Sequence, residues 1–155
     1  MKKVLFLALV LIASLTSCKK SEPYDPAKQL QIDEEIIKDF LKTNNLNALR
    51  DTSGLYYIIS KGGSGNVKYT ASTQVRVKYT LRLLDGTVIP QTTEPIKFTL
   101  GEVIPGWQIG VQKIQPGGKI RLIVPSVYAY QQQSQGGIPA NAVLDFDIEL
   151  LEIVY

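Results

Sequence analysis

The chain of 155 residues contains no histidine and only one cysteine, Cys18. Histidine is the side chain most often used as a general base or metal ligand near neutral pH, so its absence removes the commonest form of acid–base catalysis. A single cysteine has no partner for a disulfide within the chain and cannot by itself build a zinc site. If the protein is an enzyme, its reaction therefore needs neither acid–base nor covalent catalysis.

The sequence also lacks a strong excess of charge. It carries 17 lysines and arginines against 14 aspartates and glutamates, and 15 against 14 once Lys2 and Lys3 are set aside as part of a leader. Proteins that bind nucleic acid show a concentrated basic surface, which this balance does not supply. We therefore expect no nucleic-acid partner, and the residue types imply no metal and no cofactor.

A hydrophobic run long enough to span a bilayer is missing too. The longest apolar stretch, Val4 to Leu15, has 12 residues, whereas a membrane-spanning helix needs about 20. Because Lys2 and Lys3 precede this stretch, it predicts a cleaved signal peptide over residues 1–17.

The residues that follow predict attachment to a lipid. Leu15-Thr16-Ser17-Cys18 resembles the lipobox of bacterial lipoproteins, in which the leader is cut before the cysteine and the thiol is joined to a diacylglycerol. Residues 18–27 are polar and predict a tether. We expect a protein of the bacterial cell envelope, anchored to the membrane through lipid on Cys18 and facing the periplasm. Lys19 stands where enteric inner-membrane lipoproteins have an aspartate, which favours the outer membrane.

An apolar stripe predicts a helix over residues 28–43, within a helical arm of residues 28–50. Its members recur at helical spacing: Ile32, Ile36, Ile37, Phe40 and Leu41. Two roles are open for this helix. It can pack on its own domain, which we favour, or it can pair with a second copy of the chain in a dimer.

From residue 51 to residue 155 the pattern is that of a β-rich domain. Apolar and alternating segments predict strands over residues 55–59, 74–83, 87–89, 97–100, 119–124 and 143–153. Asp85-Gly86 predicts a hairpin turn, and Pro90 ends the strand that follows. The connections are too short for helical crossovers, so we expect an α+β fold with a mainly antiparallel sheet.

Two polar segments of this domain have simple interpretations. Asp145, Asp147 and Glu149 alternate along the last strand and predict its solvated face. The glycine-rich residues 61–66 lack the Gly-Lys-Ser/Thr ending of a phosphate-binding loop and predict a flexible turn.

The stretch from Leu100 to Val111 contains the only tryptophan, Trp107. Pro105 is typical of a helix start, and the proline and glycines of residues 115–118 stop the helix after one or two turns. Ile104, Trp107 and Val111 share one face of this helix. These residues alone fit equally well a core helix and the floor of an apolar pocket.

Several ordered motifs surround this stretch. They read Val-Lys-Tyr-Thr at 77–80, Asp-Gly-Thr at 85–87, Phe-Thr-Leu-Gly at 98–101, Glu-Val-Ile-Pro-Gly-Trp at 102–107, Tyr-Ala-Tyr at 128–130, Gly-Ile-Pro-Ala-Asn-Ala at 137–142 and Leu-Asp-Phe-Asp-Ile-Glu-Leu-Leu at 144–151. Over residues 55–154 the sequence resembles the FKBP family of macrolide-binding peptidyl-prolyl cis/trans isomerases. The resemblance implies a half-barrel of antiparallel strands wrapped around one short helix.

The resemblance also implies the residues of a site. A catalytic set would hold the prolyl bond over the tryptophan, and it comprises Tyr79, Trp107, Tyr130 and Phe146. A substrate-binding set would complete the apolar pocket, and it comprises Val103, Ile104, Ile138, Ile89 and Ile96. In the family, the backbone N–H matching that of Ile104 and the hydroxyl matching that of Tyr130 donate hydrogen bonds to carbonyls of the ligand.

The sequence departs from the family at one wall of this pocket. After Asp-Gly-Thr-Val the family usually has Phe-Asp, where this chain has Ile89-Pro90, and the next pocket aromatic corresponds to Ile96. We expect a peptidyl-prolyl isomerase, with reduced turnover, that assists the folding of proline-containing polypeptides. The alternative is a non-catalytic peptide-binding module or chaperone with the same groove.

Overall fold

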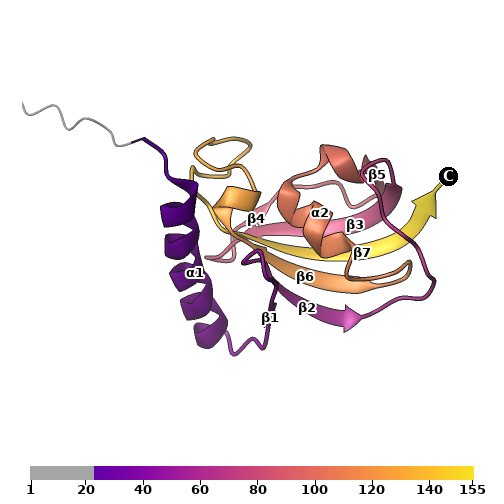
Figure 1. Ribbon diagram of the computed structural model, residues 1–155, viewed down its shortest axis with the longest axis horizontal. Coiled ribbons are helices and arrows are strands. Elements are labelled where there is room, and N and C mark those ends of the chain that lie inside the picture. Colours follow the sequence, from indigo (N-terminus) through magenta and orange to yellow (C-terminus); the bar gives the residue numbers. More distant parts are fainter. Residues whose placement is uncertain (1–22) are drawn as a thin grey trace, which may run out of the picture.

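The computed structural model describes residues 23–155 (Figure 1). The elements follow in the order α1 (Pro26–Thr43), β1 (Leu49–Arg50), β2 (Tyr56–Lys61), β3 (Gln74–Leu83), β4 (Val88–Ile89), β5 (Ile96–Thr99), α2 (Pro105–Val111), β6 (Lys119–Val124) and β7 (Leu144–Val154). Two short 3₁₀ helices, η1 (Leu100–Glu102) and η2 (Ser126–Tyr128), precede α2 and follow β6. The signal peptide, Cys18 and the first half of the tether, residues 18–22, lie outside the described residues.

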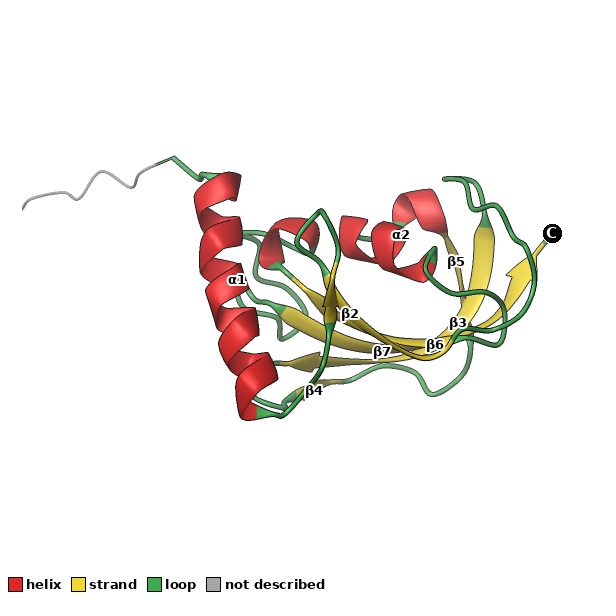
Figure 2. Ribbon diagram, turned by 60° about the horizontal axis from the view of Figure 1, so that its bottom comes forward, coloured by secondary structure: helices red, strands yellow, loops and turns green. Residues whose placement is uncertain are grey.

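The seven strands form one antiparallel sheet in the order β1-β2-β6-β7-β3-β4, with β5 also paired to β3. The sheet curves around α2, while α1 crosses one end of it (Figure 2). The predicted α+β half-barrel around one short helix is therefore confirmed. No helix within residues 23–155 has the length and apolarity to cross a membrane.

The core lies between the concave face of the sheet and α2. Alternation places Val75, Val77 and Leu81 of β3 inward, and the same rule buries Leu144, Phe146, Ile148 and Leu150 of β7. The two strands pair along their whole length, with Leu81 opposite Phe146. A bulge interrupts the register after Arg76, which lets the long strands bend around the helix.

The helix α2 can enter the half-barrel because two of its residues have no side chain. A Cβ atom on Gly106 would lie 2.4 Å from Val124, and one on Gly110 would lie 2.4 Å from Leu122. The helix therefore approaches β6 closely, with Trp107 and Val111 buried beneath it. Pro105 occupies the first turn, as the sequence predicts.

The helix α1 packs on the convex face of its own sheet, in agreement with the favoured sequence interpretation. Ile37 and Leu41 are buried with Tyr56, Ile123 and Val143 in a second apolar cluster. The helix begins two residues earlier than predicted, with the Asp25 carboxylate accepting hydrogen bonds from the first turn. The dimer remains a prediction.

This packing corrects the interpretation of Asp145. The residue lies on the convex face, as alternation requires, but its side chain is only 3% exposed because α1 and neighbouring arginines cover that region. Arg121 donates to both carboxylate oxygens at 2.9 and 2.8 Å, and Arg82 donates at 3.1 Å. Asp147 is exposed and Glu149 half-buried, closer to the expectation.

The glycine-rich turn is docked rather than free. Gln115 N–H donates to Gly62 carbonyl at 2.8 Å, and Ser64 N–H donates to Pro116 carbonyl at 3.0 Å. Gly63 has a φ of 78°, and a Cβ atom there would lie 2.1 Å from Gln115 carbonyl oxygen. The glycine at position 63 is therefore required by close backbone contact as well as by the turn.

Candidate functional site

A cleft of about 510 Å³ opens beside the first turn of α2. Its sides come from β3, β7, the segment around β4 and the loop between β6 and β7. The lining residues are Tyr79, Leu81, Ile89, Pro90, Gln91, Phe98, Glu102, Val103, Ile104, Trp107, Tyr130, Gln135, Gly136, Ile138 and Phe146. Most of these side chains are apolar or aromatic, so the cleft suits an apolar group of a ligand.

Trp107 forms the floor, and three aromatic rings stand around it. The ring centroids of Tyr79, Phe98 and Phe146 lie 4.9, 5.5 and 5.5 Å from that of the indole, with interplanar angles of 89°, 78° and 82°. Edge-to-face contacts of this kind are favourable and hold each ring in one orientation. The result is an aromatic box of fixed shape with Trp107, 3% exposed, at its base.

Two polar donors are available at the edge of the box. The carbonyl of Ile104 accepts hydrogen bonds from Trp107 and Gln108 N–H groups, which fixes the start of the helix. Among the described residues, nothing accepts a hydrogen bond from Ile104 N–H or from the Tyr130 hydroxyl. Both groups can therefore donate to carbonyl oxygens of a bound chain.

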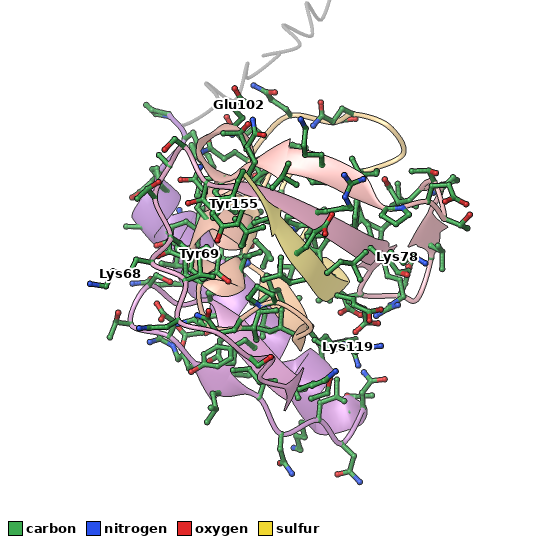
Figure 3. The ribbon with its side chains drawn as sticks, turned by 90° about the vertical axis from the view of Figure 1, so that its right-hand side faces the viewer. Lys68, Tyr69, Lys78, Glu102, Lys119 and Tyr155 are labelled. Carbon is green, nitrogen blue, oxygen red and sulfur yellow. The ribbon has the colours of Figure 1, made fainter. Side chains whose placement is uncertain are left out.

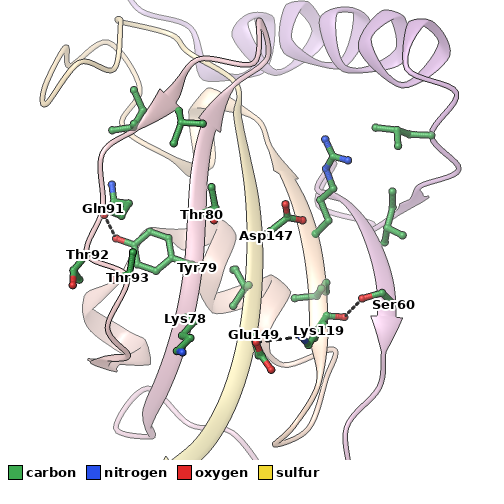
Figure 4. A pocket seen from close by; sticks show the side chains of 17 residues that line it. Ser60, Lys78, Tyr79, Thr80, Gln91, Thr92, Thr93, Lys119, Asp147 and Glu149 are labelled. Atoms are coloured by element: carbon green, nitrogen blue, oxygen red, sulfur yellow. Dashed lines mark hydrogen bonds and ion pairs between the residues drawn. The ribbon is translucent and has the colours of Figure 1, made fainter.

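The hydroxyl of Tyr79 is anchored from the opposite side. It donates to the side-chain oxygen of Gln91 at 2.5 Å, as Figure 4 shows. Burial raises the pKa of Tyr79, and the neighbouring Tyr130 raises this pKa further. The Tyr79 hydroxyl therefore stays protonated near neutral pH, as a hydrogen-bond donor rather than a base.

Eight of the nine predicted pocket residues line this one cleft. The exception is Ile96 on β5, which pairs with Val77 of β3 and is half-buried. Phe98, two residues further along the same face of β5, lines the cleft instead. The quoted Phe-Thr-Leu-Gly motif and its alternation were the signals that could have identified Phe98. Nothing in the sequence pattern indicates Gln91.

A second depression, of about 730 Å³, lies on the convex face of the sheet (Figure 4). Figure 3 shows Glu102, which lines the cleft, well apart from Lys78 and Lys119, which line this depression. The depression is larger than the cleft, but most of its charged side chains are engaged in ion pairs. Lys119 Nζ lies 3.2 Å from a Glu149 oxygen, and Arg82 pairs with Asp147. We consider the aromatic cleft the better candidate, because two of its donors, Ile104 N–H and the Tyr130 hydroxyl, have no acceptor among the described residues.

Residues 65–151 match the profile of a family described as FKBP-type peptidyl-prolyl cis-trans isomerase. Among curated relatives, the chain is similar to the FKBP-type peptidyl-prolyl cis-trans isomerase FkpA of Aeromonas hydrophila, with 47% identity over 65% of this chain and 38% of the relative. FkpA of Escherichia coli K12 is 39% identical over 66% of this chain and 38% of its own length. The chain thus spans about two fifths of these relatives' length.

Solved structures agree with the sequence comparison. The crystal structure of FkpA from Escherichia coli superposes with a TM-score of 0.70 at 33% identity, covering 83% of this chain and 62% of that one. A peptidyl-prolyl cis-trans isomerase from Pseudomonas syringae gives a TM-score of 0.68 at 29% identity, covering 86% of this chain and 98% of that one.

Proposed function

This chain belongs to the FKBP-type peptidyl-prolyl cis-trans isomerases, and from that premise we propose that it accelerates rotation about X–Pro bonds in folding polypeptides. The observation that carries the proposal is the aromatic box over Trp107, with two free donors at its edge. Its apolar and aromatic lining suits a proline ring, and a chain bound there would have the bond beside that ring shielded from water.

The chemistry follows from the polarity of the cleft. Resonance holds an ordinary peptide bond planar with a rotation barrier of about 18–20 kcal/mol. Water stabilises the polar planar form, whereas the twisted transition state has lost that resonance. Moving the bond into an apolar cleft therefore disfavours the planar form relative to the twisted one. Each reduction of about 1.4 kcal/mol in the barrier raises the rate tenfold.

The chain's own residues supply the orientation. We assign Ile104 N–H and the Tyr130 hydroxyl to carbonyls of the substrate, because both are unused within the described residues. Trp107, Tyr79 and Phe146 hold the proline ring, while Val103, Ile89 and Ile138 close the cleft around it. Differential binding of this kind needs no proton transfer, which fits a chain without histidine.

A protease-coupled prolyl-peptide assay tests this proposal. We expect the full chain to accelerate isomerisation and Trp107→Ala to lose most of that acceleration, because the floor of the box is removed. Ile36→Ala on the exposed side of α1, at 45% exposure, is the matched control and should keep the wild-type rate. Wild-type and Trp107→Ala rates that both equal the uncatalysed rate would refute isomerase activity.

The non-catalytic alternative rests on the wall at Ile89 and Pro90, which offers no carboxylate to the cleft. A peptide-binding chaperone would suppress aggregation of an unfolded client whose folding has no proline-limited step. If such a client is protected and the prolyl-peptide rate is unchanged, the alternative replaces the isomerase proposal.

We also propose that the protein is a lipoprotein of the cell envelope, with a leader over residues 1–17, lipid on Cys18, a tether over 18–27, an arm over 28–50 and the catalytic domain over 51–155. The lipobox and its position directly before a polar segment support this division. Mass spectrometry of the membrane fraction should find a lipidated N-terminal Cys18. Release of Cys18→Ala into the soluble fraction is expected, and unchanged membrane retention would contradict the anchor.

Pairing of two copies through α1 is the remaining proposal on partners. Ile32 and Ile36 are 44% and 45% exposed on the helix side turned away from the sheet. A solution mass twice that of the chain, reduced to one by Ile32→Asp, would support it. A monomeric wild type would exclude it.

A further inference from the structure

A carboxylate from α1 is buried against the loop that carries Tyr130. Asp33 and Ser126 are both fully buried. The N–H and the hydroxyl of Ser126 each donate to the same Asp33 oxygen at 2.7 Å. The other Asp33 oxygen accepts from the Gln29 side chain at 2.8 Å.

Packing of α1 does not by itself require a carboxylate at this place. Ile37 and Leu41 already fix the helix on the sheet through the second apolar cluster. A buried carboxylate is unfavourable unless hydrogen bonds replace its water. The contact between Asp33 and Ser126 is therefore a specific connection between the helix and the loop.

Ser126 in turn binds the residues on either side of Tyr130. Its carbonyl accepts hydrogen bonds from the N–H groups of Ala129 and Gln131, both at 3.0 Å, so it closes the turn on either side of Tyr130. Gln131 has a φ of 53°, a conformation that a residue with a side chain adopts only when its surroundings hold it there. The Ser126 carbonyl thus fixes the turn that presents Tyr130, while the Ser126 N–H and hydroxyl bind Asp33.

The connection joins Ser126, which lies within the match to the family profile, to Asp33, which lies before it. The profile begins at residue 65, whereas α1 ends at Thr43. Figure 1 nevertheless shows the upper half of α1 beside η2 and the loop that follows it. A segment outside the matched region therefore contacts the loop that carries Tyr130, through the buried Asp33–Ser126 pair.

We propose that Asp33 is a positioning residue for the cleft: through Ser126 it holds the turn that places the Tyr130 hydroxyl. This inference rests on the proposed isomerase function, in which Tyr130 binds a substrate carbonyl. Asp33 itself touches no substrate. Removal of the Asp33 carboxylate leaves the aromatic box intact, but the Tyr130 hydroxyl at the edge of the box is no longer held in one position.

The first test is a cycle of variants in the full chain. Asp33→Ala should lower kcat/KM for a prolyl peptide about tenfold, as expected for loss of one well-placed hydrogen bond. In the Tyr130→Phe background, Asp33→Ala should lower kcat/KM less than about twofold, because the hydroxyl that Asp33 positions is already absent. Asp33→Asn keeps an acceptor for Ser126 and should restore most of the activity. Asp39→Ala, at an exposed position of the same helix, is the control.

The second test does not depend on activity. Amide hydrogen exchange of Ala129 and Gln131 should accelerate about tenfold or more in Asp33→Ala, while exchange in β3 stays at the wild-type rate and shows that the domain is folded. Equal losses of activity in the Tyr130 and Tyr130→Phe backgrounds, or unchanged exchange at both amides, would overturn the assignment. An inactive wild type with the predicted change in exchange would instead refute the isomerase function and leave the loop contact established.

Discussion

Gln91 receives the hydroxyl of Tyr79 at the wall where the family pattern has Phe-Asp and this chain has Ile89-Pro90. An amide oxygen one residue further along the chain thus supplies an acceptor to the cleft. The carboxylate of the family's Phe-Asp pair is absent from this wall, but the Tyr79 hydroxyl has a hydrogen-bond acceptor in Gln91. The aromatic box can therefore keep its shape on a different hydrogen bond.

We predict that Gln91→Ala lowers kcat/KM by about three- to tenfold, because Tyr79 loses the acceptor that orients it. Thr92→Ala, at the next exposed position, is the control and should leave kcat/KM unchanged. Steady-state assays of both variants decide the matter. Equal activity of Gln91→Ala and wild type would show that the ring contacts alone orient Tyr79.

The pH dependence of catalysis should be flat around neutrality. Burial first, and Tyr130 second, raise the pKa of Tyr79 above its ordinary value, which is about 10. A raised pKa keeps this hydroxyl protonated at every pH below that range, and no histidine titrates near pH 7. We predict constant kcat/KM from about pH 6 to 9, measured against the uncatalysed rate at each pH. A bell-shaped profile centred near pH 7 would contradict catalysis by desolvation.

Neighbouring isoleucines on α1 provide a test at the level of the element. Ile37 is fully buried against the sheet, while Ile36 is 45% exposed. Ile37→Ala should lower the free energy of unfolding by about 2–5 kcal/mol, whereas Ile36→Ala should lower it by less than about 1 kcal/mol. Urea unfolding of the two variants measures the difference. Equal effects would mean that α1 does not pack on this domain in solution.

The strands were predictable because their side chains alternate locally. The expected ranges 74–83 and 119–124 coincide with β3 and β6, and the start of α2 follows from Pro105. The docking place of α1 depends instead on contacts distant in sequence, such as Ile37 with Ile123. That is why Asp145 was expected in solvent, and why the Asp33–Ser126 contact had no sequence signal.

The same distinction applies to the cleft. Motifs quoted from the sequence identify the floor and two walls, because those residues lie on strands and on α2 in fixed register. The segment from Pro90 to Pro95 has no such register, because β4 ends at Ile89 after only two residues and the segment that follows pairs with no strand before β5. The sequence pattern therefore gives no signal for Gln91.

For the whole molecule, two acidic groups tie the N-terminal segments to the domain. Hydrogen bonds from Arg50, which has the larger effect, and from Lys38 lower the pKa of Glu34 to about 2. Lys113, followed by the Ser53 N–H, lowers the pKa of Asp51 to about 2. Through these groups α1 is bound to β1, and the β1–β2 connection is bound to the end of α2.

These groups predict a loss of stability in acid. Both pKa values are lower in the folded protein than in the unfolded chain, where they are about 4. Their contribution is therefore present above about pH 4 and is lost as the pH falls toward 2. Asp51→Asn should flatten this part of the curve of unfolding free energy against pH, while Asp39→Asn should not. An unchanged curve in Asp51→Asn would contradict the role of the Lys113 pair.

In the proposed function, the cleft speeds rotation about the prolyl bond itself. Exchange spectroscopy by NMR measures this directly, because cis and trans forms of a short prolyl peptide give separate signals and no protease is needed. We predict that the full chain raises the cis–trans exchange rate in proportion to its concentration, and that Trp107→Ala, shown to be folded, does not. Peptide signals that broaden or shift on binding while the exchange rate stays at its uncatalysed value would contradict it.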